Sequence, residues 1–387
     1  MFTLKAVKHA LLMSALSSML GNAFAADPAQ AEWPTVTGDV KVGLVVPETG
    51  PLATVVGDSL KAGTEVIVSM WNEAHPDRAI KLTICNDEGN AERAITCVNS
   101  LKDKVDVMIG PNFGSTHAAT KELLGIKQID VVHTPHALPA PTTGIFQVAV
   151  PTEDAMGEAI QYMKSHNIKK FGFMTSTDAT GLSAREHGLK AAQALSVPVV
   201  DVQFDPGAQN LIPQVAKLAS QGVDALFIWS TGPQVVTALR AIAAARMDVP
   251  VFLNYSSMSY DLMNLVKDVT PKELLFTGDD AFDTSGIKDQ KRVEMIEEFN
   301  KRYEAKRGLP PDWMAYAYGD TFTVAMTAAL HGADRDAMVK YLENGPDIRG
   351  FHAVWRYSPQ DHIGVTKGAE TPVRIQRWNG KRWVNAE

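Results

Sequence analysis

The sequence predicts an α/β protein with two lobes, each built on a doubly wound parallel sheet with helices on both faces. The chain has 387 residues, which exceeds the roughly 100 to 200 residues of an ordinary single domain. From residue 39 onward, short runs rich in β-branched residues alternate with helical patterns, as in βαβ units. The alternation starts again near residue 152. Two series of similar length favour two lobes.

The first series extends to about residue 150. Its predicted strands are rich in valine and isoleucine, as buried parallel strands are. We expect strands at 40–46, 80–86, 105–109 and 130–133, and helices at 58–73, 91–102 and 115–125.

The second series has the same rhythm. Pro213 falls in the first turn of one of its helices, where a missing N–H removes no hydrogen bond. We expect strands at 171–175, 197–204, 225–229 and 251–254, and helices at 152–167, 183–194, 211–221 and 233–244.

Helical patterns dominate the last part of the chain, and short strands end it. The helices are expected at 288–307, 313–330 and 335–343, and the antiparallel strands at 350–357, 372–378 and 382–384. Asn379-Gly380 is a typical hairpin turn between the last two strands. Such a tail is too small for a core of its own and must pack on the lobes.

The first 25 residues have the pattern of a Sec signal peptide. Lys5 and Lys8 precede an apolar run at 10–20, and Ala23-Phe24-Ala25 forms an A-x-A cleavage site. The run is shorter than the roughly 20 residues that a membrane-spanning helix needs. We therefore expect cleavage after Ala25, export to the periplasm and no membrane insertion. The alternative is an amphipathic N-terminal helix.

Composition and charge exclude several classes of function. Hydrophobic residues make up 45% of the chain and charged residues 21%, which is typical of a globular protein. The formal net charge of −7 gives no general attraction for phosphate. Nucleic acid and anionic membrane surfaces are therefore not expected as partners.

Cys85 and Cys97 are the only cysteines. In an oxidising compartment, a lone close pair predicts one disulfide, here between the end of the strand at 80–86 and the helix that follows it. The alternative is two reduced, buried thiols, because the sequence does not show whether the two Cβ atoms meet. Two cysteines make a zinc site improbable.

Catalytic and metal-binding signatures are mostly absent. The chain has no GxxxxGK[ST], GxGxxG, HExxH or GxSxG motif. The segment from Ser285 to Lys288 matches SxxK, but the accompanying SDN and KTG motifs are missing. His133 and His136 are three residues apart on an extended segment, which places them on opposite faces and disfavours a metal site that would also use His117. We expect no enzyme, cofactor or metal.

His136 follows a predicted strand, a common ligand position in open α/β sheets. The alternative for His136 is a solvated loop histidine.

The most informative segment is that from Ile109 to Thr116. A strand ends at Gly110, a turn follows, and a helix begins with Ser115 or Thr116 near its N-cap. Its first-turn N–H groups suit a carboxylate; the alternative is capping without a ligand.

A set of glycine-, proline- and turn-rich segments is spread over the mature chain. They are Gly50-Pro51, Gly57, Gly63, Ile109-Gly110-Pro111, Ser115-Thr116, Thr134-Pro135, Asn210-Leu211-Ile212-Pro213, Gly222-Val223-Asp224-Ala225, Ala315-Tyr316-Ala317-Tyr318-Gly319-Asp320 and Ile348-Arg349-Gly350-Phe351. In these segments the chain resembles the leucine/isoleucine/valine-binding family of type I periplasmic binding proteins, which serve ABC importers.

The resemblance implies a type I periplasmic binding protein, with two lobes joined by a three-segment hinge and a ligand clamped between them. Lobe 1 is expected to comprise 39–150 and 281–350, and lobe 2 to comprise 151–280 and 351–387. The implied function is to capture a small organic solute by hinge closure and to deliver it to an ABC permease. A monomer is the usual state in this family.

The resemblance also implies ligand-binding residues on both sides of the cleft. In the first lobe, residues after the Gly-Pro turn and the Thr-Pro strand hold the ligand carboxylate; here they are Asn112, Gly114, Ser115, Thr116, His136, Ala137 and Leu138. In the second lobe, the corresponding residues are Thr180, Ser230, Thr231, Tyr255 and Ser256.

Departures from the family pattern bear on the ligand. Gly114 stands where amino-acid binders usually have a hydroxyl residue, and Leu138 where they have a threonine. Tyr255-Ser256-Ser257 stands where they have a carboxylate that pairs the ligand ammonium, and burying an unpaired ammonium is costly. We therefore expect a carboxylate without an α-ammonium, such as an aromatic acid. Its candidate walls are Phe113, His136, Trp229 and Tyr255.

Several alternatives stay open at this point. A branched-chain amino acid is the ligand if the alignment is shifted by a residue or two. An exported ligand sensor of the same fold would use the same cleft. An exported hydrolase would need a nucleophile hydrogen-bonded to a base in the cleft, and the sequence shows no such pairing pattern.

Overall fold

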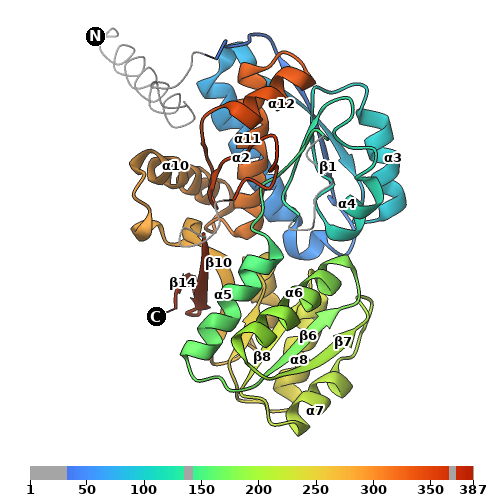
Figure 1. Cartoon of the computed structure of the whole chain (residues 1–387), viewed down its shortest axis with the longest axis vertical. Helices are drawn as coiled ribbons and strands as arrows, with labels where there is room; N and C mark the ends of the chain where they lie inside the picture. The colour runs from blue at the N-terminus through green and yellow to red at the C-terminus, as the bar shows by residue number, and fades with distance from the viewer. Residues whose placement is uncertain (1–32, 135–142, 366–371, 387) are drawn as a thin grey trace, which may run out of the picture.

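The computed structural model describes residues 33–134, 143–365 and 372–386 and has the predicted fold class (Figure 1). Two α/β lobes lie one above the other along the longest axis of the molecule, and each surrounds its own sheet. The predicted signal peptide lies outside the described residues. Within them, no helix combines the length and the apolar character needed to cross a membrane.

The sheet of the first lobe is parallel throughout, in the order β2-β1-β3-β4-β5. β1 and β3 are buried along almost their whole length, which explains their apolar sequences, and the one charged residue of β1, Lys41, is its one exposed position. β5 is absent from the sequence prediction, whose last strand in this series is at 130–133. The strands are β1 (Val40–Val46), β2 (Ile80–Asn86), β3 (Val107–Ile109), β4 (Ile129–Val132) and β5 (Ile145–Gln147).

Helices cover both faces of this sheet (Figure 1). α2 and α11 approach each other closely at Gly63, where a Cβ atom would lie 3.0 Å from the Cα atom of Ala315. A larger residue at this position would push the start of α11 away from the sheet. One face carries α2 (Ala53–Ala74), α11 (Trp313–His331) and α12 (Arg335–Asn344), and the other carries α3 (Ala91–Leu101) and α4 (Gly114–Thr120).

The sheet of the second lobe has the order β14-β13-β10-β9-β8-β6-β7. β6 to β10 are parallel, and the C-terminal hairpin of β13 and β14 joins β10 in antiparallel pairing, as predicted for the tail. Gly380 has a φ of 91° in the predicted turn of this hairpin. The strands are β6 (Phe171–Ser176), β7 (Val199–Phe204), β8 (Ala225–Trp229), β9 (Val251–Leu253), β10 (Leu274–Asp279), β13 (Val373–Trp378) and β14 (Trp383–Asn385).

The second lobe has helices where the sequence predicts them, together with α9, a short helix that it does not predict. β10 is also absent from the prediction, although its Leu-Leu-Phe run is apolar. The helices are α5 (Thr152–Ser165), α6 (Ala179–Leu195), α7 (Ile212–Ser220), α8 (Gln234–Ala244) and α9 (Tyr260–Val266).

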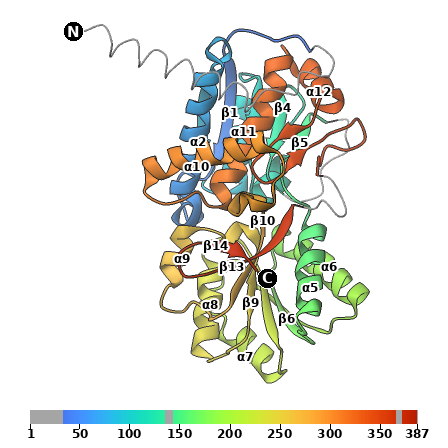
Figure 2. The same ribbon diagram turned by 90° about the vertical axis from the view of Figure 1, so that its left-hand side faces the viewer.

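The chain passes between the lobes after β5, after β10 and before β13. In Figure 2, β10 reaches the junction of the lobes, with β13 and β14 beside it. After β10, α10 (Gln290–Arg307) packs against α2, with an ion pair of 2.9 Å between Arg302 and Glu73. The chain thus leaves the second lobe at the end of β10 and continues beside the first.

The segment predicted as one strand at 350–357 forms two short strands, β11 (Ile348–Arg349) and β12 (Val354–Trp355), which pair with each other. Beyond them the chain stays beside β5: the Tyr357 hydroxyl donates to the carbonyl oxygen of Gln147 at 2.9 Å, and the Gln147 N–H donates to His362 O at 2.8 Å. These contacts hold Tyr357 and His362 against the first-lobe sheet.

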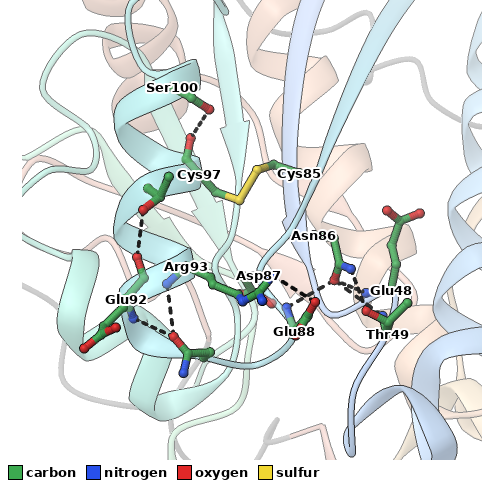
Figure 3. Close-up of a disulfide and its surroundings, with 12 residues drawn as sticks. Glu48, Thr49, Cys85, Asn86, Asp87, Glu88, Glu92, Arg93, Cys97 and Ser100 are labelled. Carbon is green, nitrogen blue, oxygen red and sulfur yellow. Dashed lines mark hydrogen bonds and ion pairs between the residues drawn. A yellow bond between two sulfur atoms is a disulfide. The ribbon is translucent and has the colours of Figure 1, made fainter.

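The predicted disulfide joins Cys85 at the end of β2 to Cys97 on α3, with their Cα atoms 5.7 Å apart (Figure 3). Hydrogen bonds fix the loop that it closes. Asn90 caps α3 by accepting from the N–H groups of Glu92 and Arg93, and Asn86 Oδ1 accepts from the N–H of Glu48 at 2.9 Å. The disulfide therefore ties α3 to the outer strand of the first sheet.

Candidate functional site

A cleft between the lobes brings together residues that are far apart in the sequence. It lies at the carboxyl ends of parallel strands from both sheets, the usual ligand position in α/β folds. Its volume in this conformation is about 30 Å³, against roughly 300 to 1,000 Å³ for ligand pockets in general. The lobes are therefore closed on each other. Lobe 1 contributes Asn112, Phe113, Gly114, His133, Thr134, Trp313 and Met314, and lobe 2 contributes Thr180, Thr231, Asn254, Tyr255 and Ser256.

Part of the predicted set lines this cleft: Asn112, Gly114, Thr180, Thr231, Tyr255 and Ser256, together with the predicted wall residue Phe113. Ser115, Thr116 and Ser230 do not. Ser115 is exposed on α4, whereas Thr116 and Ser230 are buried outside the lining. His136, Ala137 and Leu138 lie outside the described residues.

The start of α4 differs from the prediction. Its N-cap is Phe113 rather than Ser115 or Thr116, and it makes no side-chain capping bond. The Thr116 hydroxyl instead donates to the carbonyl oxygen of Phe113, 3.0 Å away. The N–H groups of the first turn therefore have no side-chain cap, and the helix begins at Gly114 in the lining of the cleft. This arrangement favours the carboxylate interpretation over plain capping.

Aromatic rings stack across the junction of the lobes. Tyr255 lies in η2 (Tyr255–Ser257), directly after β9, and its ring stacks on Trp313 at 4.6 Å between centroids. Trp229, a predicted wall residue, is fully buried and contacts Tyr255 edge-on at 5.6 Å. Trp229 therefore supports the wall from behind, while Tyr255 and Trp313 form the wall itself.

Neutral polar groups supply the rest of the second-lobe wall. The hydroxyl oxygens of Thr231 and Ser256 lie 3.5 Å apart, and the Ser257 hydroxyl donates to Asn254 Oδ1 at 2.8 Å. Burial raises the pKa of Tyr255 well above its usual value, so its hydroxyl stays protonated. This wall offers hydroxyl groups and no charge.

No residue among the described lining of the cleft is Asp, Glu, Lys or Arg. The stretch 135–142, whose position is not described, contains no such residue either. A ligand ammonium would be buried here without a counter-charge, which is strongly unfavourable. The lining therefore fits the expectation of a ligand without an α-ammonium group.

His133 lies in the first-lobe wall, directly after β4. Its backbone N–H donates to Asn112 Oδ1 at 2.8 Å. Its ring meets Phe113, Trp313 and Tyr318 edge-on, with centroid distances of 6.4, 5.8 and 4.8 Å. Burial, with a smaller contribution from His352, lowers the pKa of His133 to about 3. The imidazole is therefore neutral at physiological pH.

A buried cluster of charges lies on the other side of Trp313, at the hinge. His352 stacks on Trp313 at 5.0 Å. Its Nδ1 is 2.9 Å from Asp320 Oδ2 on α11, and its Nε2 is 3.4 Å from Asp279 Oδ2 at the end of β10. Burial lowers the pKa of His352, but Asp279 and Asp320 outweigh burial and the net shift is upward. This histidine thus connects the second-lobe sheet to α11.

Five lining residues are missing from the sequence prediction: His133, Thr134, Asn254, Trp313 and Met314. Each of the first three lies just after a strand: His133 and Thr134 after β4, and Asn254 after β9. A place after a strand is the signal that predicted His136, and the same signal could have predicted these three residues. Trp313 and Met314 begin a predicted helix, but only the folded chain shows that this helix starts at the cleft.

The sequence places this fold in a known family. A family model described as periplasmic binding protein matches residues 39–382. The chain belongs to the periplasmic binding protein family. Its fold is that of the type I, leucine-binding-protein-like members, as the sequence predicts. No curated protein matches the chain at a significant level. Members of this family are ligand-binding proteins rather than enzymes.

Solved structures of periplasmic binding proteins share the fold. An extracellular ligand-binding receptor from Rhodopseudomonas palustris HaA2 is 21% identical, with a TM-score of 0.77 over 90% of this chain and 100% of its own. A leucine-binding protein from Thermotoga maritima MSB8 is 17% identical, with a TM-score of 0.75 over 90% and 98%.

A third structure is the solute-binding protein of an ABC transporter from Rhodopseudomonas palustris BisB5, solved in complex with 3,4-dihydroxybenzoic acid. It is 18% identical to this chain, with a TM-score of 0.74 over 89% of this chain and 95% of its own. Sequence identities this low show only that the fold is shared. The ligand of this protein has to be inferred from its own cleft.

Proposed function

We propose that this protein is the periplasmic substrate-binding component of an ABC importer, and that its ligand is a small carboxylate without an ammonium group, in particular an aromatic acid. The observation that carries the ligand class is the lining of the cleft. It combines aromatic rings with neutral polar groups, and its described residues include no charged side chain. The signal-peptide pattern of residues 1–25 supports export.

Aromatic rings and polar groups, each contributed by both lobes, have separate roles in binding. Tyr255 and Trp313 offer stacked rings for the aromatic body of the ligand. The uncapped first turn of α4 and the hydroxyls of Thr231 and Ser256 offer hydrogen-bond donors for its carboxylate. Because the closed cleft holds only about 30 Å³, we propose that the ligand enters an open form and that hinge closure brings the walls together.

The test is a thermal-shift and calorimetry comparison of the mature protein with two ligand sets. One set contains benzoate, hydroxybenzoates and cinnamate, and the other leucine and valine. A ligand at about 100 times its dissociation constant stabilises the folded state by roughly 2.7 kcal/mol, which is a shift of several degrees. We expect shifts with the acids only. A shift with leucine or valine alone would overturn the proposed ligand class.

A variant pair localises the binding. Tyr255→Leu removes the ring that stacks on Trp313, and we expect at least a tenfold loss of affinity for the acid. Tyr341→Leu is the matched control, because Tyr341 is a buried tyrosine on α12 whose ring packs on Trp33, outside the cleft lining. Equal affinity losses in the two variants would place the binding elsewhere.

The transport role has its own test. Deletion of the gene should abolish high-affinity uptake of the radiolabelled acid by intact cells, and a plasmid copy should restore it. Unchanged uptake with a changed transcriptional response to the acid would favour the ligand-sensor alternative.

A further inference from the structure

The cleft contains a buried polar side chain whose hydrogen-bonding capacity is unused. His133 is 3% exposed and lines the cleft. Neither Nδ1 nor Nε2 has a hydrogen-bond partner among the described residues. Buried polar groups in folded proteins are nearly always paired, so an unpaired one indicates a missing partner. Because this ring borders the cleft, that partner can come from a ligand.

The surroundings hold the imidazole in place without satisfying it. Its backbone N–H is bound to Asn112 Oδ1 at 2.8 Å, which fixes the residue at the end of β4. The imidazole makes T-shaped contacts with three aromatic rings, those of Phe113, Trp313 and Tyr318. No polar atom of these neighbours is hydrogen-bonded to the imidazole, so they position the ring and leave both nitrogens available.

The protonation state decides which ligand group fits. A neutral imidazole has one N–H donor and one nitrogen acceptor, and a pKa lowered to about 3 keeps His133 in this form. A hydroxyl group can donate to the acceptor nitrogen or accept from the N–H. An unsubstituted aromatic ring can do neither and would leave the imidazole unpaired.

We infer that His133 hydrogen-bonds a hydroxyl group of the ligand, so that the preferred ligand is a hydroxylated aromatic acid rather than an unsubstituted one. This inference rests on the proposed function, because it assumes an aromatic acid in the cleft. It adds that a hydroxyl substituent determines which aromatic acid the protein prefers. A site that pairs a ligand hydroxyl discriminates strongly against the analogue without it, because the protein group is then left unpaired.

The experiment is a comparison of ligands and variants by titration calorimetry. Benzoate and its 2-, 3- and 4-hydroxy derivatives are titrated into the wild type and into His133→Leu. We expect the wild type to bind at least one hydroxybenzoate ten or more times as tightly as benzoate. In His133→Leu this preference should fall below threefold. His133→Gln, which keeps a donor and an acceptor, should retain part of the preference.

His362→Leu is the matched control. His362 is equally buried, but its Nδ1 is bonded to the carbonyl oxygen of Ile145 and its Nε2 to Glu343, outside the cleft lining. We expect this variant to lose stability and to keep the hydroxyl preference. Thermal unfolding of each variant establishes that it is folded. If His133→Leu does not fold, the wild-type series and His133→Gln decide.

The outcomes separate the inference from the proposed function. Binding of aromatic acids with no hydroxyl preference in the wild type, or with a preference unchanged in His133→Leu, overturns the role of His133 and leaves the proposed function standing. Failure of every acid to bind overturns the proposed function itself.

Discussion

Two buried histidines on either side of Trp313 have opposite environments. His133, in the cleft, and His352, at the hinge, are each 3% exposed. The ring nitrogens of His133 have no partner among the described residues, whereas His352 lies between Asp320 and Asp279 at 2.9 and 3.4 Å. The pKa of His133 falls to about 3 and that of His352 rises. Equal burial is therefore accompanied by pKa shifts in opposite directions.

The two environments suit different roles: that of His133 suits ligand binding, and that of His352 suits holding the fold together. A neutral, unpaired imidazole at the cleft has hydrogen-bonding capacity for a ligand and contributes little to folding. The imidazole of His352, which lies between two carboxylates, holds the end of β10 against α11 and is outside the lining of the cleft. Since Trp313 touches both rings, the binding wall rests directly on the hinge cluster.

The largest expected effect comes from replacing each histidine with leucine. His352→Leu leaves Asp279 and Asp320 buried without their imidazole partner, and we expect the free energy of unfolding to fall by about 3 to 5 kcal/mol. His133→Leu removes an unpaired polar group, and at pH 7 we expect a change of less than about 1 kcal/mol in either direction. Urea denaturation of the two variants measures both values.

An Asp279→Asn, His352→Leu double variant is the control for this comparison. It should recover part of the loss, because one buried carboxylate is removed with the imidazole. Equal losses in His133→Leu and His352→Leu would show that packing, rather than pairing, sets the contribution of each ring.

The pH dependence of stability sharpens the comparison. Burial raises the pKa of Asp279 to about 6, although His352 partly offsets it. A carboxyl group with a raised pKa contributes stability that is complete below pH 4 and is lost as the pH rises to about 6. His133, with a lowered pKa, contributes stability that is present above pH 6.5 and is lost as the pH falls.

We therefore expect two opposite slopes. Between pH 4 and pH 6, wild type should lose about 2 to 3 kcal/mol relative to Asp279→Asn as the pH rises, and should gain a similar amount relative to His133→Leu. Denaturation curves at half-unit pH steps measure both differences. Parallel slopes would contradict the assigned charge states.

The disulfide lies away from both histidines. Its removal therefore tests whether a loss of stability elsewhere in the protein leaves ligand affinity unchanged. Removing Cys85-Cys97 by a double Cys→Ser substitution should cost about 2 to 3 kcal/mol, the value for a short closed loop. Affinity for the ligand should stay within twofold, because the bond lies between β2 and α3. Calorimetry of the reduced and oxidised protein checks this result, and changed ligand selectivity would show coupling to the cleft.

The smallest effect concerns α4. Thr116→Ala removes the hydrogen bond to the Phe113 carbonyl and should cost about 1 kcal/mol. Ser115→Ala, on the exposed side of the helix, should change stability by less than about 0.5 kcal/mol. A loss of affinity in Thr116→Ala that exceeds its loss of stability would assign the hydroxyl to the ligand instead.

The fold was largely predictable because strand and helix periodicities are local. Most elements of both series lie within a few residues of their predicted positions. β5 and α9 are short, and their few residues carry no clear period. The split of 350–357 into β11 and β12 depends on contacts with α10, where Arg292 donates to the carbonyl oxygens of Gly350 and Phe351. Such contacts do not appear in a local pattern.

The cleft was predictable where strand ends and family motifs coincide, as at Asn112, Thr231 and Tyr255. The place of Trp313 in the cleft was not predictable, because this residue reaches the cleft through the packing of α11 on α2 at Gly63. The charge state of His133 depends on burial among rings from separate segments, which only the folded chain provides.

Trp313 also gives this protein an optical signal of its own. Its indole is stacked between Tyr255 and His352, and indole emission is sensitive to nearby ring stacking and to a neighbouring imidazolium. In the proposed opening of the lobes, Tyr255 moves away from it, and titration of the hinge cluster changes the charge beside it. We therefore expect intrinsic fluorescence, without any attached dye, to follow the proposed capture and release of the ligand in real time.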